Sequence, residues 1–197
     1  MGSPLRTTIC LATMILPALL GCSESTSSSG GFTISGTVQN NTQTEIPTNA
    51  RLLVVWVVSS GSPDYTYVFG QGTIDRNAGT FELVMTNPPP TAALNAGALG
   101  VGIVIATTNA SLSTGDDVVD IPATDLIGAA GWYGVIYVGD PAGAAQVRTW
   151  SADFDTGYGV GVGEEVPGSY DKFVPTSPSS VVLVIDDLSN IRFVNWT

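Results

Sequence analysis

Three acidic side chains, Asp153, Asp155 and Glu164, have the spacing and the chemistry to bind a divalent cation. They stand at positions one, three and twelve of a twelve-residue window, and their hard carboxylate oxygens suit Ca²⁺. Position six, where a helix-flanked calcium loop needs glycine, is Tyr158. We therefore predict a looser calcium site, with further acids available from Glu165, Asp116, Asp117 and Asp120. The alternative is that these acids are solvated turn residues, and no other cofactor is expected.

One of these carboxylates also belongs to a string with catalytic chemistry. Phe154-Asp155-Thr156-Gly157 resembles the signature of aspartic proteases, in which two carboxylates share a proton and activate water. That mechanism needs a second Asp, from another Asp-(Ser/Thr)-Gly in the chain or from a symmetric dimer. The sequence has no other copy, and Tyr158 follows the glycine where small dimeric proteases have Ser or Ala. A hydrolase that uses Asp155 is kept as an alternative to a turn in which Asp155 caps its own backbone.

Two other strings have the spacing of known sites without their context. Ser169-Tyr170-Asp171-Lys172 fits the S-x-x-K motif of penicillin-recognising enzymes, which needs a separate Lys-Thr-Gly, yet Lys172 is the only lysine. The stretch 157–163 has glycine spacing like that of a nucleotide-binding loop, yet no predicted helix follows and Glu164 and Glu165 would repel phosphates. We predict a loop serine in the first string and no nucleotide site in the second.

Aromatic residues of the second half offer a binding function. They are Trp132, Tyr133, Trp150, Tyr158 and Tyr170. Most are expected in the core, because large rings dominate buried area, whereas exposed rings on a β-rich surface can stack on sugars. Carbohydrate binding is therefore an alternative function alongside calcium binding.

Composition excludes several function classes. Without residues 1–21 the chain keeps 17 acidic side chains and five basic ones, a formal charge of −12. This acidity argues against nucleic acid and anionic membrane surfaces as partners. The sequence has no histidine, which removes Ser-His-Asp and Cys-His nucleophile systems and histidine-based zinc sites. We predict that the protein is not an enzyme.

The N-terminal segment has the layout of a secretory signal. Arg6 is its only basic residue, an apolar run follows from Ile9 to Leu20, and small Gly21 comes next. Twelve helical residues reach about 18 Å, well short of a hydrocarbon core of roughly 30 Å. A transmembrane anchor is therefore not expected.

Leu19-Leu20-Gly21-Cys22, at the end of this segment, resembles the lipobox of bacterial lipoprotein precursors. The resemblance implies a diacylglycerol on the Cys22 thiol, cleavage after Gly21 and acylation, for example by palmitate, of the new amino group. Such a lipid would hold the protein at a membrane of the cell envelope, since two or more acyl chains anchor stably.

The residues after Cys22 are predicted to form a tether. Ser23 to Gly31 is rich in serine and glycine, and nine such residues span roughly 17 Å. In enterobacterial lipoproteins, which the chain resembles here, a residue other than Asp after the lipidated cysteine favours the outer membrane, so Ser23 predicts that location. The domain boundaries are thus 1–21 signal, 22–31 lipidated Cys and tether, and 32–197 one domain, with a possible subdivision near 108–116.

Hydrophobic patterning of residues 32–197 predicts an all-β fold. Period-two or continuous apolar runs bounded by turn residues indicate eight or nine strands. They are placed at Phe32–Val38, Leu52–Val58, Tyr65–Phe69, Thr80–Met85, Gly100–Ala106, Trp132–Val138, Gln146–Ser151, Ser180–Ile185 and Ile191–Trp196. At most one short helix is expected, at Pro122–Ala129.

The predicted architecture is a two-sheet β-sandwich. Phe32-Thr33-Ile34-Ser35-Gly36-Thr37-Val38 and Ala78-Gly79-Thr80-Phe81-Glu82-Leu83 resemble strands of transthyretin-like, carboxypeptidase-regulatory-type modules. That resemblance implies an accessory or structural sandwich and no active site. We therefore predict a non-enzymatic, lipid-anchored envelope lipoprotein with a structural or binding role, whose glycan or protein partner the sequence does not identify.

Overall fold

The computed structural model describes residues 31–58, 65–112, 117–118 and 123–196. Leu19, Leu20, Gly21 and Cys22 lie outside these residues, so the signal, the lipidation site and most of the tether stay predictions. Among the described residues, no helix is both long enough and apolar enough to cross a membrane.

The described residues form eleven strands and one α-helix. The strands are β1 (Phe32–Asn40), β2 (Arg51–Val58), β3 (Tyr65–Asp75), β4 (Thr80–Met85), β5 (Leu99–Thr107), β6 (Asp117–Val118), β7 (Leu126–Ala129), β8 (Tyr133–Val138), β9 (Gly157–Glu164), β10 (Lys172–Thr176) and β11 (Val181–Ile185). The helix α1 is Pro141–Val147, and the 3-10 helices are η1 (Thr91–Ala93), η2 (Ala123–Asp125), η3 (Thr149–Asp153) and η4 (Leu188–Asn190). The prediction of an all-β fold is confirmed.

The architecture is a closed β-barrel with extra strands, so the prediction of a two-sheet sandwich is wrong. Seven strands form a ring in the order β5, β2, β3, β4, β1, β11 and β7, and β7 pairs again with β5. Every pair in the ring is antiparallel except β1 with β11. Strands whose apolar and polar residues alternate have the same sequence pattern in a sandwich and in a barrel, so the pattern does not distinguish the two architectures. In addition, the short strand β7, which closes the ring, was predicted to be helical.

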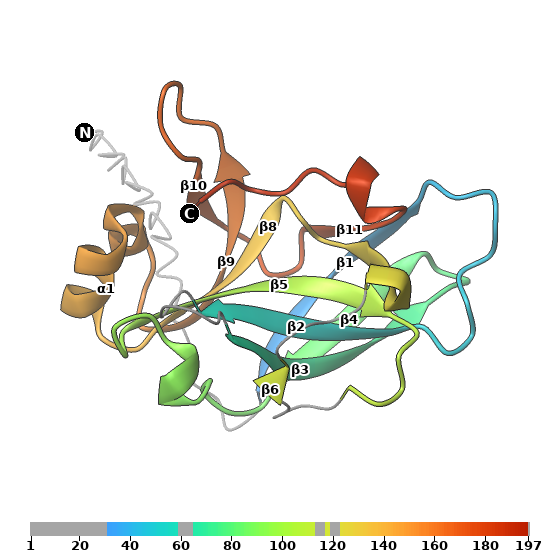
Figure 1. Cartoon of the computed structure of the whole chain (residues 1–197), viewed down its shortest axis with the longest axis horizontal. Helices are drawn as coiled ribbons and strands as arrows, with labels where there is room; N and C mark the ends of the chain where they lie inside the picture. The colour runs from blue at the N-terminus through green and yellow to red at the C-terminus, as the bar shows by residue number, and fades with distance from the viewer. Residues whose placement is uncertain (1–30, 59–64, 113–116, 119–122, 197) are drawn as a thin grey trace, which may run out of the picture.

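Strand β5 is where the sheet branches. Its one edge pairs with β2, and its other edge is divided, with Leu99–Gly102 on β8 and Ile105–Thr107 on β7. Ala130 continues this pairing by donating its N–H to the Val104 carbonyl at 2.9 Å. Strands β8, β9 and β10 therefore extend from β5 as a branch of the same sheet, which we call the second sheet and which rises away from the barrel strands in Figure 1.

The barrel interior explains the continuous apolar run of β2. Leu52, Val54 and Trp56 point into the main core, while Leu53 and Val55 belong to a second buried cluster on the outer face. Both faces of the strand are thus covered, and such strands need apolar residues at every position. The Trp56 ring fits because a Cβ at Gly100 would lie 2.9 Å from it, a space that only glycine leaves open.

Strand β9, which is not among the predicted strands, has a glycine at every second position, and these glycines allow large side chains to pack on one of its faces. Gly159, Gly161 and Gly163 leave room for rings on one face: a Cβ at Gly161 would lie 2.7 Å from Phe173 Cβ, and one at Gly163 would lie 2.8 Å from Trp132. Aromatic side chains packed over strand glycines restore the buried area that glycine lacks. The glycine string is therefore part of a sheet.

Three predicted elements are wrong. Pro122–Ala129 was expected to be a helix, but 123–125 form one 3-10 turn and 126–129 form β7. Gln146–Ser151 was expected to be a strand, but it spans the end of α1 and most of η3. Ile191–Trp196 has a strand-like pattern but forms no strand, and it packs across the sheet through bonds such as Val194 N–H to the Gly131 carbonyl, 3.0 Å.

The α-helix α1 forms instead at Pro141–Val147, directly after Asp140, a residue type that favours the start of a helix. Asp140 accepts hydrogen bonds from the backbone N–H groups of Ala142 and Gly143, and Pro141 takes the first helical position. An Asp cap followed by proline is a favoured helix start, because the cap satisfies free N–H groups and proline needs none.

Ring closure generates a test at Gly128. A Cβ there would lie 2.3 Å from the Val184 carbonyl oxygen, across the β7–β11 pair. We expect Gly128→Ala to cost about 2 kcal/mol through overpacking, which lowers the melting temperature by roughly 4–8 °C. The matched control is Gly139→Ala, whose Cβ would have contacts of 3.5 Å or more. Equal melting temperatures for the two variants would contradict this account of closure.

Candidate functional site

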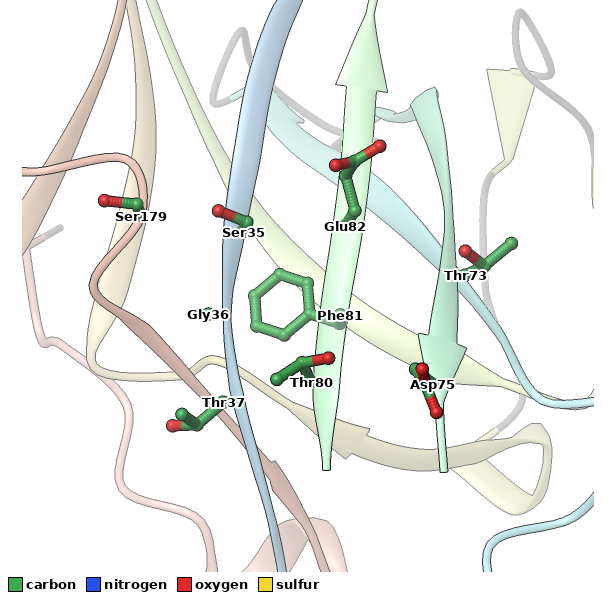
Figure 2. A pocket seen from close by; sticks show the side chains of 9 residues that line it. All are labelled: Ser35, Gly36, Thr37, Thr73, Asp75, Thr80, Phe81, Glu82 and Ser179. Carbon is green, nitrogen blue, oxygen red and sulfur yellow. The ribbon is translucent and has the colours of Figure 1, made fainter. Parts of the chain in front are cut away.

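Two surface grooves are candidates for a binding site. The first, called the hydroxyl groove, has a volume of about 460 Å³ and lies over β1, β3 and β4. Figure 2 shows its side chains, which are mostly hydroxyls with two carboxylates, Asp75 and Glu82. Asp75 already accepts hydrogen bonds from the backbone N–H groups of Asn77 and Ala78, which hold the β3–β4 turn. The only aromatic ring that lines the hydroxyl groove, that of Phe81, is 3% exposed and offers no free face to a ligand.

The second groove, called the aromatic groove, combines rings with charged groups. It has a volume of about 440 Å³ and is lined by Trp150, Tyr170 and Trp196 together with both acidic and basic side chains. Tyr170 is 61% exposed, the largest exposure of any large hydrophobic residue in the described part of the chain. Ligand sites commonly combine apolar and aromatic walls with a few polar groups, so this groove is the stronger candidate.

Packing on β9 and β10 positions the rings of the aromatic groove. Phe173 of β10 fits over Gly134 and Gly161, where no side chain competes for the space. Trp150 of η3 meets the Phe173 ring edge-on at 5.5 Å between centroids, and Trp196 lies 6.4 Å from Phe173 on the C-terminal segment. Phe173 thus holds two groove residues that are 46 positions apart in the sequence.

Charged side chains of both signs line the aromatic groove. Lys172 forms an ion pair of 3.1 Å with Glu164. Asp171 accepts a hydrogen bond from the Asn195 N–H at 3.0 Å, which ties the C-terminal segment to the groove. Arg148 and Asp153 also line the groove, and neither side chain makes an ion pair with another described residue.

The structure does not bring Asp153, Asp155 and Glu164 together. Asp153 ends η3, Asp155 precedes β9, and Glu164 ends that strand. The whole extended strand β9, whose eight residues span roughly 25 Å, lies between Asp155 and the Glu164 end. Asp116 and Asp120 lie outside the described residues, within which no group of three potential metal ligands is found. Calcium binding by the chain stays a prediction, but these three residues form no common site.

The two catalytic strings have ordinary positions. Asp155 is exposed in the bend between η3 and β9, and its side chain makes no hydrogen bond to any described residue, so the expected backbone cap is absent. Ser169 and Lys172 both line the aromatic groove, but Ser169 lies in a loop and the Lys172 ammonium is paired with Glu164.

The five aromatic residues singled out in the sequence separate into two groups. Trp150 and Tyr170 line the aromatic groove. Trp132 lies under Arg192, whose guanidinium carbon is 4.0 Å from the ring centroid, while Tyr133 and Tyr158 pack against the barrel core.

Sequence reasoning missed Arg148, Asp171 and Trp196 as groove residues. The sequence did carry a signal for the position of Arg148. Asp140-Pro141 is a helix start, and Arg148 directly follows the short helix α1 that begins there. Trp196 and Asp171 carry no such local signal, since tertiary packing alone brings them to the groove.

Searches with the sequence and the structure find no matching protein family, no matching curated protein and no matching solved structure.

Tyr158 provides a test of the packing between barrel and second sheet. Its ring stacks on Phe32 at 5.4 Å and meets Tyr137 at 4.8 Å, and its hydroxyl donates to the Asn87 carbonyl at 2.7 Å. Burial, with a smaller contribution from Tyr137, raises the pKa of Tyr158 far above its usual value. The folded state therefore keeps a proton that the unfolded chain loses near pH 10.

This difference must reduce stability as the pH rises above about 10, because the unfolded state then releases the proton more easily. We expect the urea midpoint to fall more between pH 9 and pH 11 in the wild type than in Tyr158→Phe. Ultraviolet titration should show one more late-ionising tyrosine in the wild type than in Tyr158→Phe. A parallel fall in both proteins would show that Tyr158 is not buried in this way.

Proposed function

We propose that this chain is a non-enzymatic, lipid-anchored protein of the bacterial cell envelope that binds a glycan in the aromatic groove. The observation that carries the proposal is the groove itself: the exposed ring of Tyr170 lines it together with the half-buried Trp150, the largely buried Trp196 and charged groups of both signs. Sugars present apolar C–H faces and hydroxyl edges, which suit ring faces and charged hydrogen-bonding groups respectively.

The construction of the groove supports binding. Trp150 and Trp196 are held by the buried Phe173 ring, so two walls are ordered before a ligand arrives. A preformed wall reduces the entropy that a ligand must overcome. Tyr170, on the loop before β10, is the exposed ring that a sugar can cover.

The position of the lipid is the second part of the proposal. With Cys22 as the acylated residue, the serine-rich tether that follows would separate the barrel from the membrane surface by an average of roughly 17 Å. We propose the outer membrane as the location, on the basis of Ser23. A binding domain held there meets envelope polysaccharides at high local concentration.

Lipid anchoring is tested with Cys22→Ala expressed in the bacterial host. We expect the wild type to pellet with membranes and the variant to be recovered in the soluble fraction, because the variant cannot carry a diacylglycerol. Ser25→Ala, in the tether, serves as the control and should pellet like the wild type. Recovery of Cys22→Ala in the membrane fraction would contradict the anchor.

Glycan binding is tested with Tyr170→Ala on a panel of envelope and plant polysaccharides in affinity electrophoresis. Loss of one stacking ring should weaken binding by about 1 kcal/mol, roughly fivefold. Phe193→Ala is the matched control, since Phe193 is the other exposed large hydrophobic residue in the described chain, at 39%, and does not line the groove. The proposal fails if the wild type is not retarded by any polysaccharide, or if both variants lose affinity equally.

A further inference from the structure

Arg148 stands apart from the other basic side chains of the described residues. The other four each have a partner: Arg51 donates to the Leu112 carbonyl, Arg76 to the Ile46 carbonyl, Arg192 pairs with Glu165 over Trp132, and Lys172 pairs with Glu164. The Arg148 side chain makes no hydrogen bond, ion pair or ring contact with any residue in the described ranges. Arg51, Arg76 and Arg148 all lack a carboxylate partner among the described residues, but only Arg148 also lacks a carbonyl partner.

The Arg148 side chain is also partly withdrawn from water. It lines the aromatic groove, and its Nε atom is buried with no hydrogen-bond partner among the described residues, as is the Nε atom of Arg51, which does not line the groove. A buried donor without a partner is unfavourable, and more so when it is charged. The two terminal nitrogens of the guanidinium are not buried and have no partner among the described residues, so an anion in the groove would bind there. The planar guanidinium suits a two-oxygen contact with a carboxylate.

The backbone holds Arg148 at a defined point of the groove wall. Its N–H donates to the Ala144 carbonyl at 2.9 Å, which ends α1, and its carbonyl accepts from the Ser151 N–H at 3.0 Å, which begins η3. Trp150, two positions along the same turn, is held by Phe173. The guanidinium and the ring are therefore placed together by one short segment.

The acids of the groove leave Arg148 available. Asp171 is bonded to the Asn195 N–H, and Asp153 is exposed to water, which satisfies it. Neither carboxylate lies within 4.0 Å of the guanidinium. They also disfavour a densely charged ligand such as a polyphosphate, by like-charge repulsion. The arrangement suits a ligand with one isolated negative charge beside an apolar ring face.

We infer that the ligand of the aromatic groove is an acidic glycan, whose sugar carboxylate binds Arg148 while a sugar ring covers Tyr170. This inference rests on the proposed glycan binding and adds the chemical class of the sugar. Arg148 is then the residue that discriminates acidic from neutral glycans.

The test compares acidic glycans with their carboxyl-reduced forms. The probes are neutral oligosaccharides that carry a single uronic acid and muramic-acid-containing peptidoglycan fragments, each measured by calorimetry with the full-length protein in detergent. We expect at least one acidic form to bind about tenfold or more tighter than its reduced form, the effect of one charged hydrogen bond. Arg148→Gln should remove that difference between the acidic and the reduced form. Arg76→Gln, outside the groove, should bind like the wild type.

The outcomes separate this inference from the proposed function. Equal binding of acidic and reduced forms, unchanged in Arg148→Gln, would overturn the assignment of Arg148 while glycan binding stands. No binding of any acidic or neutral glycan would overturn both. Poly-glutamate that binds as tightly as the acidic glycans would overturn the sugar class, because the groove would then recognise a carboxylate alone. Melting curves of Arg148→Gln check that the variant is folded.

Discussion

The divided edge of β5 is the constraint on which the rest of the structure depends. A strand in a sheet has two edges, and β5 shares one of them between β7, which closes the barrel, and β8, which leaves it. The chain between them, Ala130–Trp132, bends there, and a Cβ at Gly131 would lie 2.5 Å from the Arg192 carbonyl oxygen. Closure buries the core around Trp56, whereas departure creates the second sheet that carries the aromatic groove.

Glycine packing connects that second sheet to the candidate site. The bare face of β9 accepts Phe154 and Phe173, and Phe173 in turn contacts Trp150 and Trp196. The buried cluster that stabilises β8–β10 is thus also the wall of the groove. A change at a β9 glycine would act on stability and on the groove together, because the same rings serve both.

Charge and location are consistent in the proposed function. A strongly acidic surface keeps a tethered domain soluble and away from anionic headgroups, while the groove concentrates two of the few basic side chains, Arg148 and Lys172, at one place. Lys172 is neutralised by Glu164, so Arg148 supplies the available positive charge. Local arrangement of charge, and not net charge, then decides which ligand is recognised.

The sequence by itself determined the class of the fold and the positions of seven strands, because alternation and apolar runs are local properties. The short helix was also marked locally, by Asp140-Pro141, although it was expected elsewhere. Only the tertiary structure decided that the sheet closes, since closure depends on the four-residue β7 finding both β5 and β11. The groove was likewise beyond the sequence: Trp150 and Trp196 are brought together by long-range packing on Phe173, Tyr170 joins them from the loop before β10, and no local pattern encodes such an arrangement. The sequence also could not show whether Asp153, Asp155 and Glu164 meet. Their spacing suits a calcium loop, but in the structure an extended strand separates Glu164 from the other two.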